Sequence, residues 1–164
     1  MYNHLLVRGK APDGQWFEGY YLYKPNDTCM GPSNEKHMIL AYYFYDWSLS
    51  DLIATQVDPN TVDQFTGFVD SDNIKIFEND IVEFHFSSGF TRRYLIWWNK
   101  EGNQRTAVNL DELRFNGQDY YNARHQMYTY SDFCLLMQDP WGHISSIKVI
   151  GNLHDNPELI KSEG

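Results

Sequence analysis

The sequence predicts a mainly β protein. Aromatic residues are abundant, with 12 Tyr, 10 Phe and 5 Trp in 164 residues, and these residue types favour strands. Polar and apolar residues alternate clearly after Ile81, and turn-forming segments recur along the chain. We therefore expect an N-terminal β-hairpin region over residues 1–57. An SH3-like, partly open β-barrel with a short C-terminal helix should follow over residues 58–164, packed with the first region as one compact unit.

The N-terminal elements follow from turn chemistry. The turn Ala11–Gly14 should join strands over residues 4–9 and 15–24, because Pro12 presets φ and Gly14 suits a left-handed position. The next stretch, "PNDTCMGPSNE", is typical of an exposed loop. The run "HMILAYYFYDW" predicts a strand with two apolar faces, which would be central in its sheet or covered on both sides. For "DLIATQ" a short helix and an extended segment both remain open.

The middle of the chain is more regular. Asp58 and Pro59 are suited to cap and begin one turn of helix. From Ile81 onward, the apolar side chains of Val82, Phe84 and Phe86 should share one strand face. The segment "TRRYLIWW" would return as the partner strand after "SSG", and a third strand would occupy residues 104–110.

The C-terminal part is less readable. Residues 111–131 show no clean period, so their fold stays open. We expect "DFCLLMQ", with Cys134 as a small buried apolar residue, and "ISSIKVI" to be strands on either side of the turn "DPWGH". Asn156, Pro157 and Glu158 predict a short terminal helix.

Acidic residues crowd the stretch "FTGFVDSDNIKIFENDIVEF", Phe65–Phe84. A calcium loop beginning at Asp70 would place Asp72 at the next ligand position. However, Ile74 would stand at the third ligand position and Ile81 at the twelfth, where a bidentate Glu is needed. Asp70–Asn73 instead fits a β-turn, and Glu78–Asp80, centred on Asn79, fits a second tight corner. The sequence therefore predicts structural turns here and no metal site.

Three segments carry a family resemblance. The segments are "VRGKAPDGQWFEGY", "VDPNTVDQFTGFVDSDNIKIFENDIVEF" and "IKVIGNLHDNPELI", and together they resemble the YopX family of phage and prophage proteins. That family usually has glycine where Asn73 and Asn79 stand, and asparagine is the non-glycine residue best suited to left-handed φ. The resemblance implies a mainly β phage or prophage protein acting in the bacterial cytoplasm. It provides no catalytic residues to carry over.

Motifs for chemistry are lacking. The sequence contains no HExxH, GxSxG, P-loop or GxGxxG pattern. Ser145, His143 and Asp139 all fall within one turn, where they could not align as nucleophile, base and orienter. We expect no enzyme, no catalytic residue, no metal and no cofactor.

Charge and aromatic content favour protein contact as the function. With 13 Lys+Arg against 22 Asp+Glu, the net charge of −9 opposes binding to phosphate backbones and anionic membranes. The expected partners are a second copy or a bacterial host protein, and nucleic acid and membrane are not expected. The predicted contact residues are Tyr42, Tyr43, Tyr45 and Trp47, or Trp97 and Trp98.

Two alternatives stay open. One is a single-stranded nucleic-acid-binding module in which Arg92 and Arg93 contact phosphates. The other is an uncharacterised enzyme whose acidic residues converge only in the folded chain.

Overall fold

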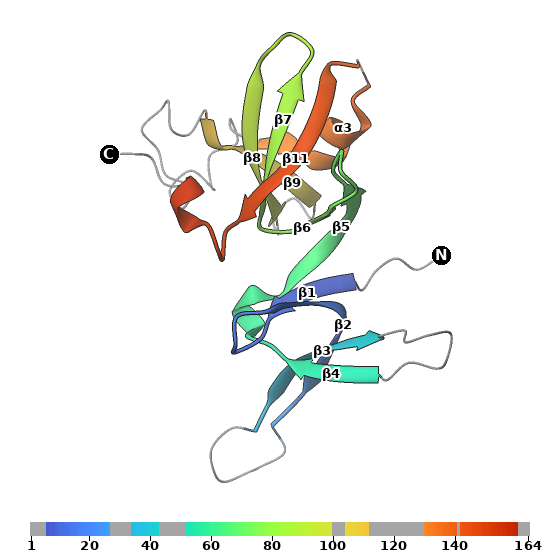
Figure 1. The fold of residues 1–164 in the computed structure, drawn as a ribbon, viewed down its shortest axis with the longest axis vertical. Coiled ribbons are helices and arrows are strands. Elements are labelled where there is room, and N and C mark those ends of the chain that lie inside the picture. The colour runs from blue at the N-terminus through green and yellow to red at the C-terminus, as the bar shows by residue number, and fades with distance from the viewer. Residues whose placement is uncertain are drawn as a thin grey trace. The chain divides into compact units, whose positions relative to one another are not determined.

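The computed structural model describes residues 6–26, 34–42, 52–99, 104–111, 130–140 and 142–160. The chain divides into two compact units, Met1–Phe65 and Thr66–Gly164, and each contains an antiparallel sheet (Figure 1). The mainly β fold is confirmed. Over the described residues the sheets are partly open and do not close into a barrel. The division falls after Phe65, whereas the sequence analysis placed a change after residue 57.

The first unit is an antiparallel sheet with the strand order β4-β3-β2-β1-β5. The turn between β1 and β2 closes as predicted, because the Gly14 N–H donates to the Ala11 carbonyl at 2.9 Å and Gly14 has a φ of 88°. The segment "DLIATQ", left open above, forms the edge strand β4. The elements are β1 Leu6–Lys10, β2 Trp16–Lys24, β3 Lys36–Tyr42, β4 Leu52–Gln56, the 3₁₀ turn η1 Pro59–Thr61 and the start of β5 Asp63–Val69.

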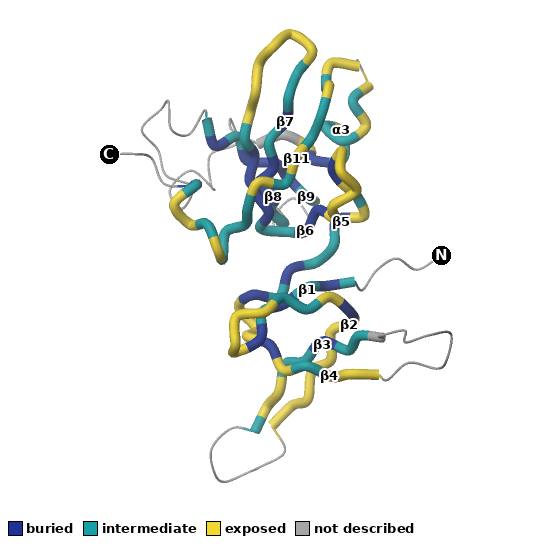
Figure 2. The backbone as a smooth tube through the Cα atoms, in the orientation of Figure 1, coloured by how far each residue is buried: buried dark blue, intermediate teal, exposed yellow. Residues whose placement is uncertain are grey.

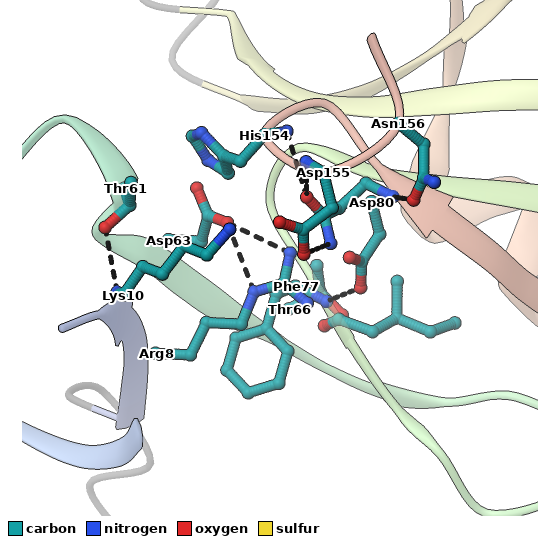
Figure 3. Close-up of polar contacts among 12 residues, drawn as sticks. Arg8, Lys10, Thr61, Asp63, Thr66, Phe77, Asp80, His154, Asp155 and Asn156 are labelled. Carbon is teal, nitrogen blue, oxygen red and sulfur yellow. Dashed lines mark hydrogen bonds and ion pairs between the residues drawn. The ribbon is translucent and has the colours of Figure 1, made fainter. Parts of the chain in front are cut away.

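The buried core of this unit is small. Val7, Ile39 and Val57 are buried together, with Phe17 and Val62 packed against them. Asp63 is fully buried and accepts hydrogen bonds from Nε and Nη2 of Arg8 at 3.2 and 3.0 Å (Figure 3). This ion pair joins β5 to β1, and little other buried apolar surface supports the sheet.

The second unit contains a sheet with the strand order β10-β9-β8-β7-β11. The predicted alternation in β7 is confirmed, since Val82, Phe84 and Phe86 contribute to one apolar cluster while the side chains of Glu83 and His85 pair with each other at 2.9 Å. Its strands are β7 Asp80–Phe86, β8 Thr91–Asn99, β9 Gln104–Asn109, β10 Tyr130–Asp132 and β11 Ile144–Asn152. The unit also contains β6 Lys75–Phe77, which is the neighbour of β5 in the other sheet.

This sheet has apolar clusters on both faces. One cluster joins Leu95 in β8 to Ile160, which lies in the 3₁₀ turn η3, Pro157–Ile160. The other joins Ile96 in β8 to Phe133. Because neighbouring residues of a strand point to opposite faces, Leu95 and Ile96 divide between the two clusters. Figure 2 shows buried residues concentrated in these central strands.

The prediction of a strand at "DFCLLMQ" is wrong. Phe133–Gln138 forms the α-helix α3, in which Cys134 is half-buried. The Asp132 carboxylate caps the helix by accepting from the Leu135 N–H at 3.0 Å, and Asp139 ends it in a left-handed conformation with a φ of 39°. An Asp at each end and helix-forming Leu and Met between them outweigh the apolar run that suggested a strand.

The other predicted turns are confirmed. Asp58 caps η1 by accepting from the Asn60 N–H at 2.9 Å. The short terminal helix is the 3₁₀ turn η3. Asn73 and Asn79 have φ angles of 64° and 63°, the left-handed conformation expected where the family has glycine.

The turn at Asp70 fastens β11 in place. The buried Asp70 carboxylate accepts from the N–H groups of Asp72 and Ile74, both at 2.9 Å, and from that of Val149 at 3.0 Å. The Ser71 hydroxyl accepts from the Ile147 N–H at 2.8 Å. The side chains of Asp70 and Ser71 therefore bond backbone N–H groups on the outer side of the edge strand β11. The acidic stretch thus has a structural role.

Replacing Asp70 should destabilise the second unit. Asp70→Ala leaves three donors without their acceptor, so we expect the free energy of unfolding to fall by about 2–4 kcal/mol. The matched control is Asp72→Ala, because the Asp72 side chain is 65% exposed and its loss should cost less than about 0.5 kcal/mol. Urea unfolding followed by tryptophan fluorescence measures both variants. Equal stability losses would contradict the role of Asp70.

The same carboxylate should make stability depend on pH. Burial alone raises the pKa of Asp70, but hydrogen bonds from the Val149, Ile74 and Asp72 N–H groups bring that pKa below its ordinary value of 3.8. Because the pKa is lower in the folded state than in the unfolded state, the ionised carboxylate stabilises the fold at a pH above the unfolded-state pKa. This stabilisation is lost as the pH falls through the folded-state pKa. Wild-type protein should therefore lose stability below about pH 4 more steeply than Asp70→Asn. If the free energy of unfolding, measured in urea at each pH, falls equally steeply with falling pH for both proteins, this prediction is wrong.

Candidate functional site

The aromatic residues predicted to form contacts divide into two groups. Tyr43, Tyr45 and Trp47 lie outside the described residues, and Tyr42 ends β3 opposite Leu52 of β4. In the second unit, Trp97 packs against the cluster that contains Leu95. Trp98 lies across from Arg105, whose guanidinium carbon is 5.7 Å from the centre of its ring. Both tryptophans are half-buried and are engaged with their own unit.

A more exposed apolar surface lies on the first unit. Residues directly opposite in a ladder share a sheet face, and the ladders align Tyr20 with Leu40 and Leu40 with Ala54. Tyr20, Leu22 and Leu52 are 54%, 45% and 49% exposed. We call this surface the apolar sheet face; it consists of Tyr20, Leu22, Met38, Leu40, Leu52 and Ala54. Among the described parts of this unit, no element covers it.

The sequence analysis missed this surface. The sequence predicts strands at Tyr20, Leu22, Met38 and Leu40, whereas it leaves "DLIATQ", with Leu52 and Ala54, open. Alternation also states only that a strand has two faces and not which of them another layer will cover. Ile39, between Met38 and Leu40 in β3, is fully buried. The buried core therefore lies on the opposite face of the same strand.

The outer edge of β4 is also available for pairing. The ladder between β3 and β4 continues one step beyond its last pair, where the Val57 N–H donates to the His37 carbonyl at 2.9 Å. Hydrogen-bonding groups alternate in direction along an antiparallel strand. The backbone groups of Ile53 and Thr55 therefore point toward β3, and those of Leu52, Ala54 and Gln56 point outward. Figure 2 shows β4 as largely exposed.

Arg92 and Arg93 do not form one basic patch. As neighbours in β8, they project to opposite faces of the sheet. Arg93 is held by Asp111, which accepts from the Arg93 backbone N–H at 2.8 Å and from Nε at 3.0 Å. Arg8 of the first unit is likewise held by buried Asp63.

A cavity of about 410 Å³ lies beside α3 in the second unit. Phe86, Leu135, Leu136, Pro140 and Ile144 give it apolar walls, and Asp132, Asp139 and His143 contribute polar groups. The volume is within the range of small-molecule sites, roughly 300–1,000 Å³. Polar groups and apolar walls therefore meet at a cavity of ligand size.

Asp139 is an anchored anion in this cavity. Its carboxylate accepts from the N–H groups of Ile144 and His143, both at 2.9 Å. The Ile144 hydrogen bond is the main reason that the pKa of Asp139 lies below its ordinary value. The Ser145 hydroxyl donates elsewhere, to the His85 carbonyl at 2.9 Å. These contacts place Asp139 as a fixed negative charge, and they do not link it to Ser145 through His143 in the way a catalytic triad requires.

Two kinds of structural feature are absent from the described ranges. Over those residues, no group of three or more His, Cys, Asp or Glu side chains gathers in a way that could hold a metal ion. None of the described helices is both long and apolar enough to cross a membrane.

Comparison with known proteins gives the family. The family model described as YopX protein matches residues 18–161. The chain belongs to the YopX family. The YopX match agrees with the resemblance found in the sequence. It includes the two turns in which Asn73 and Asn79 adopt the left-handed conformation. No curated protein and no solved structure gives a significant match.

The two adjacent arginines should behave differently. Arg93→Ala removes the guanidinium that pairs with Asp111 and keeps the backbone N–H, so we expect the free energy of unfolding to fall by about 1 kcal/mol. Arg92 is exposed, and Arg92→Ala should change that free energy by less than about 0.5 kcal/mol. Chemical denaturation of the two variants in the same buffer tests this difference. A greater loss for Arg92→Ala would show that the contacts of Arg93 with Asp111 are not stabilising.

Proposed function

We propose that this YopX-family protein is a non-enzymatic phage or prophage protein of the bacterial cytoplasm that works by protein–protein contact and associates with a second copy through β4. The observation that carries the proposal is the uncharged strand "LIATQ", Leu52–Gln56, at the edge of a sheet with an exposed apolar face. Exposed edge strands pair readily with other strands. Apolar sheet faces of this kind are typical of interaction surfaces.

Backbone geometry suggests a register for the second copy. Leu52, Ala54 and Gln56 carry the outward donors and acceptors. A two-fold axis at Ala54 would place Ala54 opposite Ala54 of the second copy and Leu52 opposite its Gln56. Each of these pairs brings outward groups face to face, so all three pairs can exchange hydrogen bonds. A shift by one residue would instead oppose outward groups to inward ones.

The lack of charge in β4 also permits pairing at this edge. The net charge of −9 opposes association in general, but β4 itself has no charged residue. Pairing at the edge would join two apolar sheet faces into one larger apolar surface. We expect a weak, concentration-dependent dimer, because a short edge contact buries less surface than a standard interface of about 1,600 Å².

A charge placed on the axis should prevent association. Ala54→Lys would oppose two lysines across the two-fold axis, where like charges are destabilising. Sedimentation velocity over a range of concentrations should show a monomer–dimer equilibrium for wild type and a monomer for this variant.

The control for this experiment is Gln15→Lys. It makes the same charge change in an exposed turn, two strands removed from β4 in the sheet order. It should leave the dimer intact. The proposed self-association fails if wild type is monomeric throughout, or if Ala54→Lys dimerises as wild type does.

The register can be tested by cross-linking. Paired Ala54 residues would have Cα atoms about 5.5 Å apart, within the disulfide range of about 4.4–6.8 Å. In a background with Cys29 and Cys134 changed to Ser, Ala54→Cys should therefore form a covalent dimer on mild oxidation. Ile53→Cys should not, because its two Cα atoms would be about 8 Å apart. The opposite result would reject this register.

The two alternative functions, a nucleic-acid-binding module and an enzyme, make different demands on the protein. A nucleic-acid-binding module would bind single-stranded DNA with an affinity that falls as salt rises, and no binding at low salt would end that hypothesis. An enzyme would need reacting groups at the cavity beside α3, where Asp139 is instead bonded to backbone N–H groups.

A further inference from the structure

The cavity beside α3 has an ordered pattern of charge and apolar surface. Asp132, Leu135, Leu136 and Asp139 all line it. Along the chain this lining reads acidic, apolar, apolar, acidic. Asp132, with an extended backbone, caps the start of the six-residue helix α3, and Asp139, with a left-handed backbone, caps its end. The helix between the two acids has a rise of about 9 Å.

The opposite wall of the cavity is mainly apolar. Phe86 in β7 and Ile144 in β11 lie across from the helix, with Pro140 following it in the chain. Phe86 and Ile144 are also members of the cluster that packs around Phe133. A ligand between the carboxylates would therefore rest on side chains that the core already holds in position.

Both carboxylates are fixed but still able to accept. Asp132 accepts one backbone hydrogen bond, from Leu135, and Asp139 accepts from His143 and Ile144. An ionised carboxylate offers about four acceptor positions. Each can therefore receive an ammonium N–H without giving up its role at the end of the helix.

We propose that this cavity binds a linear organic dication, a diamine or polyamine with an apolar methylene spacer. Its two ammonium groups would contact Asp132 and Asp139, and its spacer would lie along Leu135 and Leu136. A charge separation of roughly 5–10 Å fits the helix length after allowance for two hydrogen bonds. The two carboxylates would attract a cation and repel an anion. This site does not depend on the proposed self-association.

The test compares ligands that differ only in charge. Putrescine, cadaverine and spermidine are titrated into the full chain, with n-butylamine as the single-charge probe and n-butanol as the neutral one. Methyl NMR signals of Leu135, Leu136 and Ile144 report binding at the cavity. The diamines should bind at least about threefold more tightly than n-butylamine, and n-butanol should produce no saturable shift.

Two variants separate this site from general attraction to an acidic protein. Asp132→Asn keeps the helix cap, because Asn and Asp cap equally well, and should weaken diamine binding about three- to tenfold. Asp72→Asn makes the same charge change at an exposed position of the same unit and should leave binding unchanged. Leu135→Ser removes apolar wall from a residue that is 48% exposed, and it should weaken the diamines without unfolding the chain.

Each outcome decides the proposal. Diamine affinity that falls with Asp132→Asn and not with Asp72→Asn supports it. Equal effects of these two variants, equal affinity for n-butylamine and the diamines, or absence of methyl shifts at the cavity would overturn it. Because α3 and β4 lie in different units, loss of diamine binding would leave the monomer–dimer result unchanged, so the two proposals can fail separately.

Discussion

The hydrogen-bonding requirement of strand edges governs this structure. Every outer strand of a sheet presents donors and acceptors that a neighbour, a side chain or water must satisfy. At the edge strand β11, Asp70 and Ser71 satisfy the N–H groups of Val149 and Ile147. At the edge strand β4, the described residues provide no such cover for the outward groups. Within the described residues, side chains bond the outer side of one edge strand, and no side chain bonds the outer side of the other.

The acidic residues are explained by the same requirement. The buried acids Asp63, Asp70 and Asp80 each accept hydrogen bonds that join separate parts of the backbone or a basic side chain. Asp80 receives the Phe77 N–H at 2.7 Å in the corner that begins β7 (Figure 3). A cluster of carboxylates in sequence thus becomes a set of separately hydrogen-bonded groups in the folded chain.

Local chemistry made the turns predictable, and tertiary context limited the rest. Asn73 and Asn79 could be placed from sequence because a left-handed corner needs glycine or asparagine. The helix α3 was mistaken for a strand because "FCLLM" has no polar residue to show a period, and the capping role of Asp132 was not considered. The apolar sheet face and the cavity beside α3 depend on which surfaces other elements cover. Residues near in sequence contain no information about that coverage.

The size of the first unit explains why apolar side chains remain outside. A unit spanning Met1–Phe65 can bury only about 60% of the surface that its unfolded chain exposes. Its buried cluster of Val7, Ile39 and Val57 lies on one face of the sheet, and the described residues of this unit provide no layer against the aromatic and aliphatic residues of the other face. The second unit is larger and covers both faces of its sheet. An exposed apolar face is therefore consistent with the small size of this unit, and removing that face from water would require another surface to pack on it.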